Sequence, residues 1–279
     1  MRDRKLVLSA HFDEMPVEEQ IHLFAKVGFE GFFTGWQQGA PVKRWRKAAD
    51  ECGMLYQSVH GPFHGCAALW KEDGEAADAF VKELTDCLHD CADNGIPLMI
   101  SHVFIGFDTG MTPTAIGVER FGKVIREAER CGVKIAFENT EGEAFLSMIL
   151  NAFGGSDAVG FCWDTGHEMC YNGGKDMTAL YGKYLLGTHL NDNLGVRRFD
   201  GTITWHDDLH LLPFDGIGDW AGIARRLKQW DFTDVLTFEL NRDSKPDRHE
   251  NDAYKRMSME EYVTNAYMRA CRVAALIDR

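Results

Sequence analysis

The sequence predicts an α/β protein folded as a single (β/α)8 barrel, the TIM-barrel architecture, over residues 1–279. Three observations lead to this prediction. Short apolar runs alternate with helical patterns eight times, no linker or change of composition divides the chain, and polar side chains that can bind metals close most of the apolar runs. A barrel of parallel strands places its chemistry at that rim, so we expect these side chains to meet there.

The first half of the chain supplies four of the expected units. Strands are expected at residues 6–10, 29–33, 55–59 and 97–101, with helices at 16–27, 42–52, 75–94 and 113–131. Apolar residues recur at helical spacing in the helical segments. Glycines at positions 28, 53, 95 and 132 end these helices, and Pro113 can open the fourth.

The second half repeats the pattern. Strands are expected at residues 135–137, 159–163, 185–188 and 235–238, with helices at 143–153, 177–184, 217–230 and 259–277. The loop from 191 to 216 is the longest that we expect. Gly216 and Gly218 precede the helix at 217–230, where they could offer backbone N–H groups to an anion or could only allow the loop to turn.

Composition narrows the classes of function. With 45% hydrophobic residues the chain can bury a large core, and a formal net charge of −13 disfavours nucleic acid as a partner. The first residues lead into an apolar run too short for a signal peptide, and nothing reaches the length of a membrane span, so we expect a cytoplasmic protein. The eight cysteines include no CxxC pair, which indicates reduced thiols rather than a thiolate zinc site. Whether the chain forms a homo-oligomer stays open.

Four consecutive strands of the second half end in residues that bind metals: Glu138, Asp164, His189 and Glu239. This hard, mostly oxygen ligand set suits Mn²⁺, Mg²⁺, Co²⁺ or Zn²⁺ and leaves coordination positions for a substrate. The alternative at each acidic position is that the carboxylate only caps the helix that follows its strand. Four such positions in succession favour a metal site.

Five further residues extend this set. His60 and His102 close the third and fourth strands, and His167 lies three residues beyond the carboxylate of the sixth. Asp208 and His210 lie in the longest loop, where their alternation directs both side chains to one side if the segment is extended. We interpret these five residues as substrate-binding groups or ligands of additional metal. For the pair in the loop, the equal alternative is that they are ordinary charged residues exposed to solvent.

Other side chains fall near the same rim. His11 and His64 are candidates for supporting the site. Five aromatic residues at or beyond strand ends could form the wall of a sugar site, although we expect at least half of them to pack in the core: Trp36, Phe63, Trp70, Trp163 and Trp205.

The chain resembles the xylose-isomerase-like TIM-barrel superfamily, which holds sugar isomerases, ketose 3-epimerases, inosose dehydratases and endonuclease IV. The stretches that carry the resemblance are Ser58–Phe63, Phe137–Asn139, Cys162–His167, Thr188–Asn193, Asp208–Pro213 with Gly216, and Phe238–Leu240. They span most of the chain in the expected order. The resemblance to the isomerases and epimerases implies one divalent metal on Glu138, Asp164, His189 and Glu239, with the two glutamates also moving protons.

This arrangement suits chemistry next to a carbonyl group. The metal would polarise a carbonyl and the neighbouring hydroxyl, which acidifies the C–H bond between them and stabilises an enediolate. Glutamates on opposite faces of the enediolate would invert a carbon, whereas return of the proton to the next carbon gives isomerisation. The sequence therefore predicts a metal-dependent isomerase or epimerase of carbohydrate metabolism, acting on a small sugar, sugar phosphate or polyol.

Endonuclease IV provides the alternative, a hydrolase of phosphodiesters that uses three zinc ions. The resemblance extends to all nine of its ligands by type and order: His60, His102, Glu138, Asp164, His167, His189, Asp208, His210 and Glu239. The acidic net charge and the lack of an identifiable DNA-wedging loop count against this alternative. No lysine follows the fourth or fifth strand end as in true xylose isomerases, which makes a hydride shift doubtful. A non-catalytic sugar-binding barrel ranks last, because a binder needs no opposed glutamates.

Overall fold

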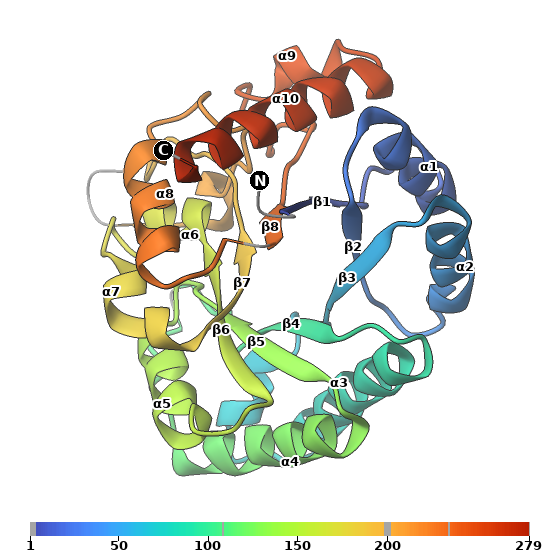
Figure 1. Ribbon diagram of the computed structural model, residues 1–279. Helices are drawn as coiled ribbons and strands as arrows, with labels where there is room; N and C mark the ends of the chain where they lie inside the picture. The colour runs from blue at the N-terminus through green and yellow to red at the C-terminus, as the bar shows by residue number, and fades with distance from the viewer. Residues whose placement is uncertain (1–3, 108, 198–201, 234, 279) are drawn as a thin grey trace.

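The computed structural model describes residues 4–107, 109–197, 202–233 and 235–278. Over these residues eight parallel strands form a barrel with helices around it, which confirms the predicted (β/α)8 fold (Figure 1). The strands follow one another around the barrel in chain order, and β1 pairs with β8. Residues 1–3, which bear on the expected absence of a signal peptide, and residues 198–201 of the predicted long loop lie outside the described residues.

The strands are close to their predicted positions. They are β1 (Lys5–Ser9), β2 (Gly31–Gly35), β3 (Leu55–His60), β4 (Leu98–His102), β5 (Lys134–Glu138), β6 (Val159–Asp164), β7 (Leu185–His189) and β8 (Val235–Phe238). The predicted helices correspond to α1 (Val17–Val27), α2 (Val42–Cys52), α3 (Glu75–Asp93), α4 (Ala115–Cys131), α5 (Glu143–Phe153), α7 (Met177–Tyr181), α8 (Trp220–Gln229) and α10 (Met259–Ile277).

Several short helical segments were not predicted. They are α6 (Thr165–Cys170), α9 (Asp252–Lys255) and the 3₁₀ turns η1 (Cys66–Trp70) and η3 (Trp205–Asp207). The helix expected at 177–184 is α7 followed by the 3₁₀ turn η2 (Gly182–Tyr184). Helix α8 begins three residues later than expected, because Asp219 caps its N-terminus by accepting a hydrogen bond from Gly222 N at 2.9 Å.

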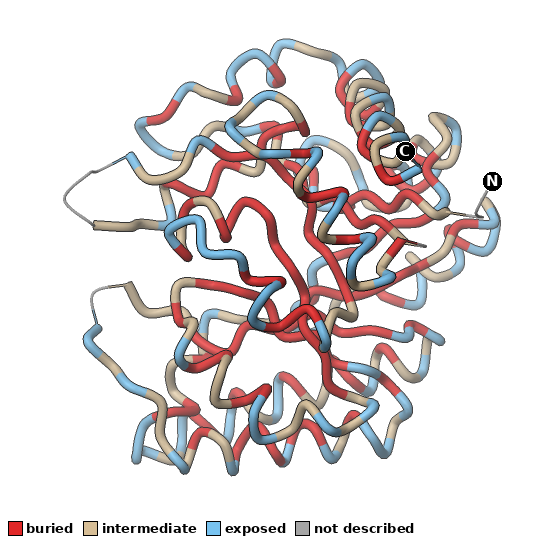
Figure 2. Tube along the Cα trace, turned by 60° about the vertical axis from the view of Figure 1, so that its left-hand side comes forward, coloured by how far each residue is buried: buried red, intermediate tan, exposed pale blue. Residues whose placement is uncertain are grey.

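The apolar residues form two layers. A large cluster fills the space between the strands and the helices, and a small one inside the barrel consists of Leu98, Ile100, Ala136 and Cys162 with Leu186 against it. Figure 2 shows this burial along the strands and on the inner faces of the helices. All eight cysteines are free, as predicted. Within the described residues, no helix combines the length and the apolar character that crossing a membrane requires.

The barrel closes between β7 and β8 with fewer backbone contacts than its other joins. Beyond the end of β7, Leu190 forms an isolated parallel bridge with Phe238, and its N–H donates to Thr237 O at 2.8 Å. The N–H of Thr237 donates to the side-chain oxygen of Thr188 at 3.2 Å. At this join, a threonine hydroxyl thus takes the place of the main-chain carbonyl that would accept the hydrogen bond in a regular parallel sheet.

Candidate metal centre

The predicted ligands lie at one level of the barrel because of strand register. Side chains alternate along a strand, so Glu138 points the same way as Ala136, which belongs to the cluster inside the barrel. Pairing of β4 with β5 sets His102 beside Glu138, and pairing of β6 with β7 sets Asp164 beside His189. The sequence therefore delivers these polar groups to the top of the barrel core.

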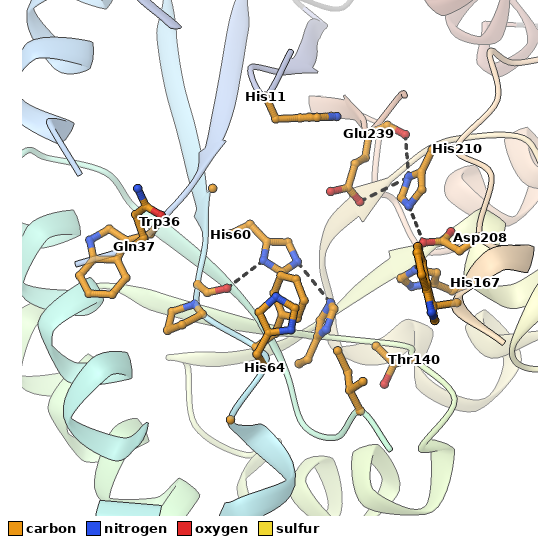
Figure 3. Close-up of a pocket in the computed structure, with 18 of the residues that line it drawn as sticks. His11, Trp36, Gln37, His60, His64, Thr140, His167, Asp208, His210 and Glu239 are labelled. Carbon is orange, nitrogen blue, oxygen red and sulfur yellow. Dashed lines mark hydrogen bonds and ion pairs between the residues drawn. The ribbon is translucent and has the colours of Figure 1, made fainter. Parts of the chain in front are cut away.

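All nine predicted residues contribute to three groups, in each of which the ligand atoms lie within 4.8 Å of one another, and Glu138 belongs to two of them. The central group is Glu138, Asp164, His189 and Glu239; the His60 group is His60, His102 and Glu138; the His210 group is His167, Asp208 and His210. Figure 3 shows several of these side chains turned toward a common cavity. The structure thus brings together every residue that the sequence predicts for the site.

The central group has the chemistry of a site for a divalent cation. His189 Nδ1 lies 2.9 Å from Glu138 Oε1 and 3.1 Å from Glu239 Oε2. Glu138 and Asp164 are fully buried. Three carboxylates converge on one imidazole and two of them are fully buried, so their full ionisation is costly unless a cation balances the charge. The residues present therefore fit a divalent metal.

In the His60 group, a main-chain carbonyl orients the imidazole of His60, whereas the buried Nδ1 of His102 has no hydrogen-bond partner among the described residues. His60 Nδ1 donates to Gly61 O at 2.9 Å, so its Nε2 presents a lone pair toward the cluster when the ring is neutral. This Nε2 lies 3.4 Å from Glu138 Oε2, and His102 Nε2 lies 2.9 Å from the same oxygen. Histidines that ligate metals are oriented in this way by a carbonyl on the other ring nitrogen.

The His210 group repeats this arrangement. His167 Nδ1 donates to Asn139 O at 3.0 Å. His210 Nδ1 donates to Glu239 O at 3.1 Å. The Nε2 atoms of the two histidines face Asp208 Oδ2 at 3.4 and 2.8 Å. His210 adopts a positive φ of 48°, which is uncommon for a residue with a side chain, so the segment is not extended at this position, and yet Asp208 and His210 face each other.

Burial and pairing shift the pKa values of the site. Burial lowers the pKa of His102 to about 4, although Glu138 beside it favours protonation. Burial raises the pKa of Asp164 to about 7, which His167 only partly opposes. For His210, burial lowers the pKa but the Asp208 carboxylate outweighs it and raises the pKa to about 9. Metal binding needs deprotonated ligands, so it would release protons from Asp164 and His210 near neutral pH.

Two asparagines that sequence reasoning left without a role hold Asp164 in place. Asn139 accepts from Asp164 N at 2.8 Å and donates to Asp164 O at 2.9 Å, while Asn191 Nδ2 donates to Asp164 Oδ2 at 2.9 Å. The other carboxylate oxygen accepts from His167 N at 2.6 Å and caps α6. The carboxylate of Asp164 therefore caps α6, as the alternative interpretation expected, and also belongs to the central group. A buried asparagine directly after a strand end is the signal that could have revealed this support.

The suggested anion site at Gly216 and Gly218 is wrong, because the protein's own carboxylate takes the donors there. The fully buried Asp192 accepts from Gly218 N and Phe214 N, each at 2.9 Å, and from Trp220 Nε1 at 2.8 Å. Gly216 is instead packed closely against Asn193 and Asp192. This contact fixes the long loop onto the start of α8.

A cavity of about 1070 Å³ opens above the three groups. Its walls include Trp36, Phe63 and Trp205, as well as His11 and His64 from the predicted rim. Trp70 and Trp163 are buried in the core, so the aromatic residues divide between wall and core. Glu239 lines the cavity, whereas Glu138 lies buried beneath it.

The fold and the ring of histidines and carboxylates define the class: a barrel with its reactive groups at the carboxyl ends of the strands. The chain belongs to the xylose isomerase-like TIM barrel family, whose model matches residues 21–259. A curated relative, the uncharacterized protein y4fM of Sinorhizobium fredii, is 32% identical over 152 residues. That match spans 50% of this chain and 44% of the relative, so the chain corresponds to less than half of its length.

Solved structures share the fold at low sequence identity. The IolI protein, crystallised with a binding zinc atom, has a TM-score of 0.78 and 17% identity, covering 97% of this chain and 98% of that one. A D-psicose 3-epimerase crystallised in the presence of D-fructose has a TM-score of 0.67 and 18% identity, over 97% and 99% of the two chains. An L-ribulose 3-epimerase has a TM-score of 0.69 and 17% identity, covering 99% of this chain and 95% of that one.

Proposed function

We propose that this protein is a divalent-metal-dependent isomerase or epimerase of a small carbohydrate or polyol. The observation that carries the proposal is that two glutamates meet at one imidazole. Glu138, which ends β5, and Glu239, which follows β8, lie 2.9 and 3.1 Å from His189 Nδ1. The structural likeness to an L-ribulose 3-epimerase and to the zinc-containing IolI protein supports it. Mn²⁺, Co²⁺, Mg²⁺ and Zn²⁺ all suit this ligand set.

The central group would hold the metal through Glu138, Asp164, His189 and Glu239. When bound, the metal supplies a Lewis acid that polarises the carbonyl of the substrate. We propose that the carboxylate of Glu239, which lines the cavity, takes the proton from the carbon next to that carbonyl. Return of a proton from the Glu138 side to the same carbon gives epimerisation, and return by Glu239 to the neighbouring carbon gives isomerisation.

The remaining ligand candidates can position the substrate. His60, His167 and His210 line the cavity, and each is held by a carbonyl on Nδ1. Their Nε2 atoms can bind substrate hydroxyl groups. The buried asparagines keep Asp164 rigid, so the ligand set is organised before substrate arrives.

Proton exchange tests this proposal directly. The protein, reconstituted with Mn²⁺ and placed in D₂O with a panel of ketoses, is expected to exchange deuterium into the carbon next to the carbonyl, as followed by NMR. Chelated protein and Glu239→Gln provide the negative controls. Absence of exchange with every sugar, in protein whose metal content has been verified, would contradict the function.

A second candidate is a hydrolase of small phosphoesters that uses three metals. The specific observation in its favour is that all three ligand groups are assembled, not only the central one. The net charge of −13 disfavours long nucleic acids as substrates. Elemental analysis after reconstitution with zinc, combined with hydrolysis of bis(p-nitrophenyl) phosphate, tests this candidate: one metal per chain and no hydrolysis would exclude it.

A further inference from the structure

The cavity is larger than one sugar ring requires. Pockets for drug-sized ligands usually measure roughly 300–1,000 Å³, and this cavity reaches about 1070 Å³. A monosaccharide is much smaller than a drug-sized ligand, so one that contacted the central group would leave most of the cavity to water. The unused space therefore bears on the size of the substrate.

The cavity has two ends, which lie on different sides of His60 (Figure 3). We call the part lined by His167, Asp208, His210 and Glu239 the inner end, and the part lined by Trp36, Gln37 and Gln38 the outer end. Strand β2, which leads into the outer end, lies four strands from β6 in the strand order. Figure 3 shows Trp36 and Gln37 on the side of His60 opposite to His210 and Glu239.

The outer end has a rigid aromatic wall. The indole Nε1 of Trp36 donates to Asp90 Oδ2 at 2.7 Å, and the residue is only 9% exposed, so its ring is fixed in place. Phe63 continues the wall toward the inner end, with its ring 5.4 Å from that of His60 and 5.0 Å from that of His102. The fixed indole of Trp36 reaches the cavity only in part, and together with the exposed amides of Gln37 and Gln38 it offers an apolar contact for C–H groups and hydrogen bonds for the hydroxyls of a sugar ring.

The charges around the cavity favour a neutral occupant at the outer end. Among the lining residues that the structure describes, Lys245 is the single lysine or arginine. It lies near the inner end, 3.8 Å from Asp208 Oδ2 and 5.5 Å from the centre of the Trp205 ring. The charged residue that lines the cavity from α3 is Glu83, a carboxylate. A phosphate group would meet no described partner of opposite charge at the outer end, whereas sugar hydroxyls would find amide partners.

From this arrangement we propose that the substrate is an extended, neutral sugar of at least two units. The carbonyl-bearing unit lies at the inner end against the central group, and a second sugar unit occupies the outer end against Trp36 and Gln37. This inference rests on the proposed function for the reaction itself, but the second subsite is a property of the cavity. It predicts a preference for glycosylated ketoses over both free ketoses and their phosphates.

Three ketoses that differ only at one end test this preference: D-fructose, D-fructose 6-phosphate and 6-O-α-D-glucopyranosyl-D-fructose. The kcat/KM for deuterium exchange is expected to be at least about tenfold higher for the disaccharide than for fructose, which corresponds to about 1.4 kcal/mol. The phosphate is expected to be no better than fructose. Equal values for fructose and the disaccharide, or a preference for the phosphate, would overturn the inference.

Variants of the outer end localise the effect. Trp36→Ala and Gln37→Ala are each expected to reduce the disaccharide-to-fructose ratio of kcat/KM several-fold, whereas Trp36→Phe retains most of the ratio because it keeps an aromatic face. Gln229→Ala is the matched control, since Gln229 lies at the exposed end of α8 outside the cavity. A ratio that stays unchanged in both Trp36→Ala and Gln37→Ala would contradict the assignment of the outer end.

Binding without turnover separates this inference from the proposed function. Methyl β-maltoside and methyl β-glucoside have no free carbonyl, so their dissociation constants can be measured by calorimetry whether or not any sugar reacts. We expect the maltoside to bind at least about tenfold more tightly, and this difference to fall in Trp36→Ala. If no ketose exchanges deuterium but the maltoside binds more tightly than the glucoside, the proposed reaction is contradicted and the second sugar subsite is supported. Equal affinities would exclude the subsite whatever the reaction.

Discussion

The Nε2 atoms of His60 and His102 lie 3.2 Å apart in a buried part of the site. Both nitrogens also face Oε2 of Glu138. Because Gly61 O accepts from Nδ1 of neutral His60, the Nε2 of His60 presents a lone pair toward this oxygen. A ring nitrogen lone pair beside a buried carboxylate oxygen is an arrangement that a cation stabilises.

Metal binding is therefore expected to stabilise the fold. Addition of Mn²⁺ or Zn²⁺ to chelated protein should raise Tm, because the ligand groups exist only in the native state; about 3–4 kcal/mol follows at 100 to 1,000 times the Kd. Glu138→Ala should abolish most of this shift, since Glu138 belongs to two groups. Glu119→Ala is the control, because Glu119 is exposed on α4 and belongs to none of the ligand groups. A full shift in Glu138→Ala, measured by calorimetry, would contradict this placement.

The two glutamates should be indispensable for exchange. Glu138→Gln and Glu239→Gln replace each carboxylate by an amide of nearly the same shape that cannot accept the proton, so the rate should fall by roughly 10²–10⁴ or more. Deuterium exchange measures the rate, and elemental analysis of the same samples separates loss of chemistry from loss of metal. Normal activity in both variants would remove the acid/base pair from the mechanism.

The raised pKa of His210 predicts how stability varies with pH in chelated protein. The folded-state pKa of about 9 exceeds the ordinary value of 6.5, so its stabilisation is fully present below pH 6.5 and is lost as pH rises through about 9. The loss is at most about 3 kcal/mol. Urea unfolding at several pH values should show it in the native chain and not in His210→Gln. Metal affinity should change in the opposite direction and increase toward pH 9.

Close packing at Gly166 predicts that even a methyl group disturbs the site. A Cβ there would overlap the side-chain oxygen of Asn191, whose amide holds Asp164. Gly166→Ala should therefore weaken metal binding about tenfold or more, as measured by competition with a chelator. Gly155→Ala is the control, because a Cβ at Gly155 meets no atom within 4 Å. Equal affinity in the two variants would show that Asn191 does not organise the ligand.

The buried Asp192 predicts a large effect on folding. Asp192→Ala leaves the N–H groups of Gly218, Phe214 and Trp220 without their acceptor, which should cost about 3–5 kcal/mol. Asp219→Ala removes only the exposed cap of α8 and should cost about 1 kcal/mol. Urea denaturation of both variants gives the comparison. Similar losses would mean that the loop contact at Asp192 contributes little.

The strand ends were predictable because they depend on local pattern. Apolar runs of strand length end in Glu138, Asp164 and His189, and parallel pairing brings such ends to one rim whatever the loops do. Six of the nine ligand candidates follow from this one geometric rule, whereas His167, Asp208 and His210 lie beyond the strand ends. The xylose isomerase-like family adds the order of the motifs and the expected chemistry.

The loops were less predictable because contacts distant in the sequence decide their conformation. Asp192 reaches Gly218 across 26 residues, which turns an apparent anion site into an internal hydrogen-bond network. The positive φ of His210 likewise depends on its bond to Glu239 O, 29 residues away. Helix α6 is short and follows its strand without a loop, so no amphipathic pattern announced it.

The join between β7 and β8 bears on the distance between two proposed metal ligands, His189 and Glu239. His189 and Glu239 follow these two strands, which share one isolated backbone bridge and a hydrogen bond to the Thr188 hydroxyl. Because few hydrogen bonds hold this join, we expect the distance between His189 and Glu239 to change at a small cost in free energy. If a divalent metal binds there, cations of different radius should therefore bind with similar affinity.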